Sequence, residues 1–170
     1  ETKSLDNMRS AKTVFYTDPV SGLQVRGEII EYRDFPAIEW ILYFKNTGSA
    51  DTPIIEGIQA LDISVKSTTA DAILHYNRGA SCRPEDFQPY RRVMNAGAKL
   101  SLRPGGGRSS SEYLPSFNLE QNPGSGLMMA IGWTGEWEAT FEEDYARNTH
   151  IQAGLALTHD TERCRHRADE

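Results

Sequence analysis

The chain has 170 residues, a formal net charge of −6 and 38% hydrophobic residues, enough to bury an apolar core as a single domain. The acidic balance argues against a nucleic-acid partner, because nucleic-acid phosphates need a basic face. No apolar run reaches the roughly 20 residues of a membrane-spanning helix, so we also expect no membrane partner.

The first residues, ETKSLDNMRS, have neither an initiator Met nor the apolar core of a signal peptide, and we expect a processed product or an excised fragment. The compartment is not readable from the residues, and an extracellular or periplasmic location is only a working assumption. Cys82 and Cys164 are too few for a disulfide framework, and we expect both to be free thiols.

Apolar and polar residues alternate with a period of two, which predicts strands. The first two such runs, at 22–30 and 37–45, are joined by RDFP at 33–36, which we interpret as a hairpin turn. NTGSAD at 46–51 is a turn cluster. Further extended segments follow at 54–65, 99–102, 127–141 and 151–159.

The pattern predicts an all-β fold with almost no helix, built as a large antiparallel β-sandwich. At best one helical turn fits at 83–92, where two prolines limit it. We expect a single sandwich domain over residues 1–159. The polar ending at 160–170 lacks alternation and is expected to be a disordered tail.

Two tryptophans lie in LMMAIGWTGEWEATF at 127–141. As one continuous strand, this segment places Trp133 and Trp137 on the same face. One interpretation puts both in the core, with Gly135 leaving room for a close neighbour. The other exposes one indole, above all Trp137, to stack on a sugar ring while Glu136 binds the hydroxyls.

The segment GGGRSSSEYLPSFNLE at 105–120 raises the question of a phosphate cradle. It lacks the spacing of a P-loop or a dinucleotide-binding turn, so we interpret it as a glycine-hinged loop. Arg108 either fixes this loop through hydrogen bonds or reaches outward to a ligand. Ser109 and Tyr113 complete the candidate sugar contacts.

Other catalytic patterns are weak. No G-x-S-x-G motif or metal-ligand spacing of His and Cys occurs, so we expect no metal, no cofactor and no catalytic triad. Two carboxylates can hydrolyse a glycosidic bond, and Glu136, Glu138 and Glu112 are the first suspects for such a role. The acidic FEEDY at 141–145 is interpreted as solvated surface.

Three segments carry a resemblance to a known family: the run from Gly22 to Asp62, the 105–120 loop and AIGWTGEWEATF at 130–141. In this order they resemble the N-terminal β-sandwich (supersandwich-like) domain of α-galactosidase-like enzymes of glycoside hydrolase family 36, from about Phe15 to His159. The ending DTERCRHRADE departs from the family pattern.

The resemblance implies a large β-sandwich that packs against a (β/α)8 barrel, and the barrel holds the catalytic aspartates. No catalytic residue carries over to this chain. The family's sandwich can contribute sugar contacts, sometimes across an oligomer. The matching positions here are Asp34 and Phe35 in the 33–36 turn, and Arg108 and Ser109 in the loop.

Three functions follow as hypotheses. The leading one is a non-catalytic domain that binds an oligo- or polysaccharide, in the context of an α-galactosidase-like hydrolase. The second is a structural domain whose exposed patch packs on a barrel or on a second copy of itself. The third is a stand-alone glycosidase that uses two carboxylates.

Overall fold

A computed structural model describes residues 1–67, 71–122 and 124–155. These residues form strands and loops without any helix, which confirms the all-β class and leaves no helix that could cross a membrane in this part of the chain. They fall into two compact units, residues 1–56 and the unit that begins at Gly57. The expected tail at 160–170 and Cys164 lie outside the described residues, and the single domain over 1–159 remains a prediction.

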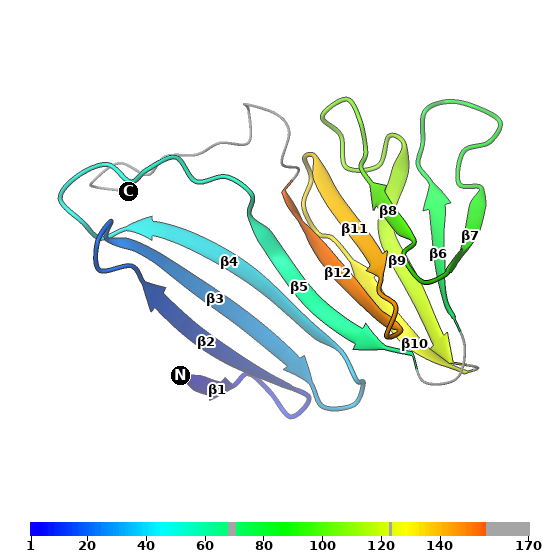
Figure 1. The fold of residues 1–170 in the computed structure, drawn as a ribbon. Helices are drawn as coiled ribbons and strands as arrows, with labels where there is room; N and C mark the ends of the chain where they lie inside the picture. The colour runs from blue at the N-terminus through cyan, green and yellow to red at the C-terminus, as the bar shows by residue number, and fades with distance from the viewer. Residues whose placement is uncertain (68–70, 123, 156–170) are drawn as a thin grey trace. The chain divides into compact units, whose positions relative to one another are not determined.

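The first unit is a four-stranded antiparallel sheet in the order β1-β2-β3-β4 (Figure 1). Its strands are β1 (Thr2–Ser4), β2 (Arg9–Thr17), β3 (Leu23–Tyr32) and β4 (Ile38–Asn46). Ile29 lies opposite Trp40 and Val25 opposite Phe44, so the alternation in the sequence gathers apolar side chains on one face. Within residues 1–56, all of which are described, no apolar side chain is fully buried.

The second unit is a β-sandwich of two four-stranded antiparallel sheets, in the orders β10-β9-β6-β7 and β5-β12-β11-β8 (Figure 1). Its strands are β5 (Gln59–Lys66), β6 (Ala72–Arg78), β7 (Pro89–Met94), β8 (Lys99–Leu102), β9 (Tyr113–Asn122), β10 (Ser125–Ala130), β11 (Trp137–Glu143) and β12 (Asn148–Leu155).

Aromatic side chains join the two sheets of this unit. The ring of Phe117 on β9 meets Trp137 and Phe141 of β11 edge-on, at centroid distances of 5.6 and 5.3 Å. Each fully buried apolar side chain of this size contributes about 1.5–3 kcal/mol relative to an exposed one. The other buried apolar residues are Ala72, Leu74, Met94, Leu102, Leu119, Ala139, Ile151 and Ala153.

The turn between β11 and β12 is held by one carboxylate. Asp144 accepts hydrogen bonds from the backbone N–H groups of Ala146 (2.7 Å) and Asn148 (2.8 Å), and from the Asn148 side chain (2.7 Å). The Asn148 side-chain bond is the main cause that lowers the pKa of Asp144 to about 2. Arg147 adopts a left-handed conformation here, with φ of 64°.

Candidate functional site

Three loops meet at one end of the second unit, which we call the loop end: residues 79–88, 103–112 and 131–136. The Gly79 and Ala80 N–H groups donate to the carbonyl oxygens of Glu112 and Ser110, both at 2.8 Å. The Gly107 N–H donates to the Glu136 carboxylate, also at 2.8 Å. Loops at the end of a rigid sandwich are where binding residues commonly lie, so the loop end is the candidate site.

The glycine run lies in a loop, as the sequence predicts, but the loop ends at residue 112, because strand β9 begins at Tyr113 and continues through the rest of the 105–120 segment. Gly106 and Gly107 have φ values of 71° and 73°. Glycine adopts this left-handed conformation readily because it has no Cβ, whereas other residues rarely do. The Ser111 hydroxyl donates to the carbonyl oxygen of Gly105 and, at 3.3 Å, to that of Arg108. Because the Gly107 N–H is already bonded to Glu136, it is not free to bind a phosphate.

Trp137 corrects the expectation of an exposed stacking surface. Its side chain is fully buried, and its indole N–H donates to the Ser109 carbonyl oxygen at 2.7 Å. Phe117 covers one part of the ring. Burial between the sheets leaves no indole face for a sugar, so Trp137 acts as an anchor for the 103–112 loop.

Trp133 has a different environment, because 127–141 is not one strand. β10 ends at Ala130 and β11 begins at Trp137, and the Ile131 N–H bonds to the Pro115 carbonyl at 2.8 Å where the chain leaves the sheet. Trp133 therefore lies in a loop, 51% exposed. Its ring lies so close to Gly135 that a Cβ there would be 2.7 Å from the indole nitrogen.

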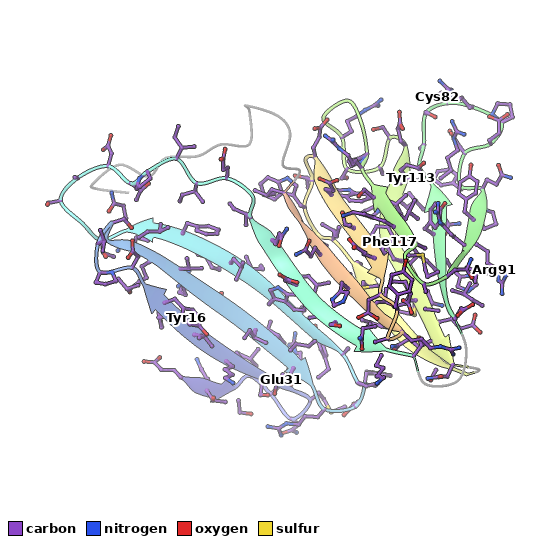
Figure 2. The ribbon with its side chains drawn as sticks, in the orientation of Figure 1. Tyr16, Glu31, Cys82, Arg91, Tyr113 and Phe117 are labelled. Atoms are coloured by element: carbon purple, nitrogen blue, oxygen red, sulfur yellow. The ribbon has the colours of Figure 1, made fainter. Side chains whose placement is uncertain are left out.

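The remaining residues that the sequence predicts for a sugar site in this unit are Arg108, Ser109 and Tyr113, and they lie in or next to the 103–112 loop. Arg108 is exposed, and within the described residues its guanidinium makes no hydrogen bond or ion pair. Ser109 is half-buried and contributes its carbonyl to Trp137. Tyr113 begins β9 and lies beside Tyr76, with ring centroids 5.9 Å apart; Figure 2 labels it.

The carboxylates proposed for catalysis differ in their surroundings. One oxygen of Glu136 holds the Gly107 amide, which gives this residue a structural task. Glu138 pairs opposite Gly154 on β12, and exposed Glu112 lies beside Gly105. Across the described ranges, no group of three His, Cys, Asp or Glu side chains has the arrangement of a metal site.

Asp34 and Phe35 lie in the first unit, on the turn between β3 and β4. The sequence predicts this turn, and the structure confirms it: the Tyr32 N–H bonds to the Ala37 carbonyl at 3.1 Å. Phe35 is 67% exposed. The Arg33 N–H bonds to the Met8 carbonyl at 2.9 Å, which ties this turn to the one that precedes β2.

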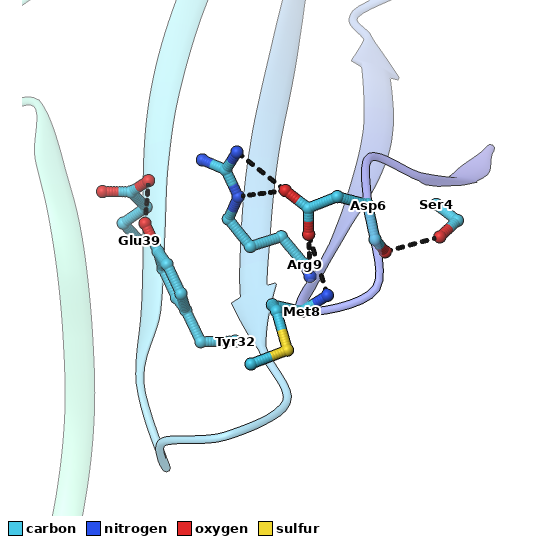
Figure 3. Close-up of polar contacts among 6 residues, drawn as sticks. All are labelled: Ser4, Asp6, Met8, Arg9, Tyr32 and Glu39. Atoms are coloured by element: carbon cyan, nitrogen blue, oxygen red, sulfur yellow. Dashed lines mark hydrogen bonds and ion pairs between the residues drawn. The ribbon is translucent and has the colours of Figure 1, made fainter.

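A polar network holds that second turn (Figure 3). Asp6 accepts from the backbone N–H groups of Met8 (2.8 Å) and Arg9 (2.7 Å) and forms an ion pair with the Arg9 guanidinium at 2.8 Å. The Met8 amide, followed by the Arg9 side chain, lowers the pKa of Asp6. The Tyr32 hydroxyl donates to Glu39 at 2.8 Å, so hydrogen bonds link β3 and β4 just below the turn that carries Phe35.

Sequence reasoning missed part of the loop end. Tyr76 on β6 and Tyr90 on β7 stack at 5.3 Å, next to Tyr113. The two tyrosines come from segments 14 residues apart in the sequence, and only strand pairing brings them together. The signal that was available is the repeated spacing of Tyr76 with Arg78 and Tyr90 with Arg92.

The fold and the loop end define a β-sheet protein with an exposed indole and, within the part of the chain that the structure describes, an arginine without a partner on neighbouring loops of one unit. No family model matches the sequence, and no curated protein sequence matches it. Solved structures do match: among them are α-galactosidases of glycoside hydrolase family 36.

AgaA from Geobacillus stearothermophilus aligns with a TM-score of 0.78 and 18% identity, over 100% of this chain and 23% of that one. The galactosidase domain of the α-galactosidase–sucrose kinase AgaSK aligns with a TM-score of 0.78 and 17% identity, over 96% and 22%. The α-galactosidase from Lactobacillus brevis gives 0.73 and 16%, over 92% and 22%.

These matches confirm the fold that the sequence resemblance implies. The chain spans less than a quarter of the length of these α-galactosidases, as expected if it corresponds to one domain of them. At this level of identity the likeness concerns the fold.

Proposed function

We propose that this chain is a non-catalytic, carbohydrate-binding β-domain of the kind built into α-galactosidase-like glycoside hydrolases. The observation that carries the proposal is Trp133, 51% exposed on a loop at the end of a sandwich. A flat aromatic face stacks on the apolar C–H face of a sugar ring, and nearby polar groups bind the hydroxyls. The ligand class is an oligo- or polysaccharide.

Each residue of the loop end then has a separate role. Trp133 supplies the stacking surface, and Arg108, exposed and without a partner among the described residues, donates to sugar hydroxyls or ring oxygens. Glu136 and Trp137 fix the 103–112 loop through Gly107 and Ser109. A loop fixed before binding loses less conformational entropy when the ligand arrives.

The fold likeness supports a galactoside context for the proposal. Structures of AgaA variants contain raffinose and stachyose. In this proposal, hydrolysis of the galactoside is carried out by a separate (β/α)8 domain and not by this chain. In the first unit, exposed Phe35 with Asp34 on the 33–36 turn gives a second contact, to sugar or to that domain.

The test is a titration of the chain's tryptophan fluorescence with galactose, raffinose and longer gluco-, xylo-, manno- and galacto-oligosaccharides. We expect a saturable change for one class, lost in Trp133→Ala and retained in Phe35→Ala, which removes another exposed aromatic side chain, from the other unit. A flat response at millimolar sugar overturns the proposal. Hydrolysis of raffinose by the chain, abolished in Glu138→Gln or Glu112→Gln, would replace it with the two-carboxylate glycosidase.

A second candidate function is a structural domain that packs against another domain. The supporting observation is the first unit, where large apolar side chains are exposed on both faces of the sheet: Ile38 (54%) and Tyr16 (71%) on one, Ile41 (59%) and Phe15 (51%) on the other. Exposed apolar surface of this kind marks interaction sites. This function predicts concentration-dependent self-association in sedimentation velocity, reduced by Ile41→Asn, with no response to sugars.

A further inference from the structure

Three tyrosines gather on the inner face of the sheet β10-β9-β6-β7, at the loop end. Tyr76 and Tyr90 stack with centroids 5.3 Å apart and planes inclined at 30°, and Tyr113 tilts against Tyr76 at 5.9 Å and 58°. All three are half-buried. The cluster is therefore part of the sandwich wall and also reaches solvent.

Two arginines belong to the same face. Arg78 follows Tyr76 by two residues on β6, and Arg92 follows Tyr90 by two on β7, so each pair of side chains shares a face. The pKa of the Tyr76 phenol is raised, mainly by burial. The nearby charge of Arg92 acts in the opposite direction and lowers this pKa. We call these five residues the tyrosine–arginine patch.

The arginines of this patch have no anionic partner in the described part of the chain. The Nε of Arg78 is buried and bonds to nothing there, which is costly for a charged donor. Residues 78–92 contain four arginines but only two acidic residues, Glu85 and Asp86, so this segment carries a net positive charge. Asp86 is already committed to its own loop, where it accepts from Ser81 and Arg83.

We propose that the tyrosine–arginine patch binds a carbohydrate ring that bears an anionic group, a carboxylate or a phosphate. A guanidinium fits either group with paired, charge-assisted hydrogen bonds, and Arg92, which is exposed on an edge strand, makes this contact. Tyr90 and its neighbours supply aromatic surface for the ring. This site is separate from Trp133 and takes a charged ligand.

The 79–88 loop borders the tyrosine–arginine patch and has a defined conformation. It keeps Phe87 in a left-handed conformation, with φ of 64°, and leaves its ring 59% exposed. The Phe87 carbonyl accepts from the Asn77 side chain at 3.2 Å. A bulky residue holds such a backbone only where its surroundings impose it, so this loop has a defined shape next to the patch.

The test follows amide and tyrosine ring signals of the isotope-labelled chain by NMR during titration with galacturonic acid, galactose 6-phosphate, galactose and inorganic phosphate. We expect saturable shifts at the patch for an acidic sugar, with galactose at least about tenfold weaker, because charge-assisted hydrogen bonds contribute that much. The tighter of the two acidic sugars identifies the anionic group. Added salt should weaken binding.

Arg91 provides a matched control. It precedes Arg92 and is also exposed, and its side chain has no partner among the described residues. Because it is the neighbour of Arg92 on β7, where it lies opposite His75, its side chain is on the other face of the strand; Figure 2 labels Arg91. Arg92→Gln should weaken the acidic sugar about tenfold or more, and Arg91→Gln should change it less than about twofold. Both variants remove one exposed charge, so unfolding midpoints equal to that of the parent chain are expected.

Three results would overturn the proposal. Equal weakening by Arg91→Gln and Arg92→Gln would reveal only a diffuse surface charge. Inorganic phosphate that binds as tightly as galactose 6-phosphate would reveal an anion site without sugar recognition. Absence of saturable shifts at the patch would remove the site. Trp133→Ala should leave acidic-sugar binding unchanged, so this proposal and the neutral-sugar proposal can fail independently.

Discussion

The contrast between Trp133 and Trp137 can be tested by the same substitution, tryptophan to phenylalanine, at each position. Trp137 is fully buried, and its N–H donates to the Ser109 carbonyl at 2.7 Å. In Trp137→Phe the hydrogen bond is lost and a partly buried carbonyl is left without a donor, at about 1–3 kcal/mol. The smaller ring leaves a space beside Phe117 that adds about 1 kcal/mol.

Trp137→Phe should therefore lower the free energy of unfolding by about 2–4 kcal/mol, a large share of the roughly 5–15 kcal/mol typical of a domain. Trp133→Phe should change it by less than about 0.5 kcal/mol, because Trp133 is half exposed and its N–H makes no hydrogen bond to any residue that the structure describes. The assay is urea unfolding followed by far-ultraviolet circular dichroism, whose signal comes mainly from the backbone amides and not from the indole removed. Equal midpoints and slopes for the two variants would refute the assignment of Trp137 as anchor.

Three further predictions concern the loops and strands. Glu136→Ala should abolish hydrogen-exchange protection of the Gly107 amide, whose acceptor at 2.8 Å is removed. Gly154→Ala should lower the unfolding midpoint sharply, because the new Cβ would collide with the Ile58 carbonyl. The folded-state pKa of Asp144, about 2, lies below the ordinary value of 3.8 for an aspartate, so the stabilising effect of this carboxylate is complete above the higher value and disappears as pH falls through about 2. The thermal midpoints of Asp144→Ala and the parent chain should therefore differ at pH 6 and converge near pH 2.

Each of these has a contrary outcome. Persistent protection of the Gly107 amide in Glu136→Ala would mean that the loop is fixed by its other bonds, those of Ser111 and Trp137. An unchanged midpoint in Gly154→Ala would mean that β5 moves aside at no cost. A difference between Asp144→Ala and its parent that stays constant down to pH 2 would mean that the carboxylate is not the stabilising group of its turn.

Much of the fold is predictable from the sequence because strand alternation is a local property. The face of β11 that carries Ala139 and Phe141 and the face of β12 that carries Ile151 and Ala153 are fully or almost fully buried, as period two predicts. The turn at 33–36 is equally local, because proline and a short polar run end a strand without help from the rest of the chain.

The loop end is less predictable for a physical reason. Alternate positions from Leu127 to Phe141 are apolar apart from Gly135, so the sequence alone predicts one strand and cannot separate Trp133 from Trp137. The separation depends on Ile131 bonding to Pro115 and on the packing of Phe117 against Trp137, which are contacts between distant parts of the chain. Tyr76 and Tyr90 meet for the same reason, through the pairing of β6 with β7.

The sequence by itself determined the all-β class, the strands within its alternating runs, the loop at the glycine run and the resemblance to an α-galactosidase domain. It did not predict β1, β2, β6, β7 or β9. Only the tertiary structure decided which indole is exposed, that Glu136 fixes the loop, and that arginines without an anionic partner among the described residues lie beside a tyrosine cluster. Secondary structure follows from the backbone preferences and polarity of neighbouring residues. A binding surface depends on which side chains other segments leave uncovered, and that is settled only when the sheets pack.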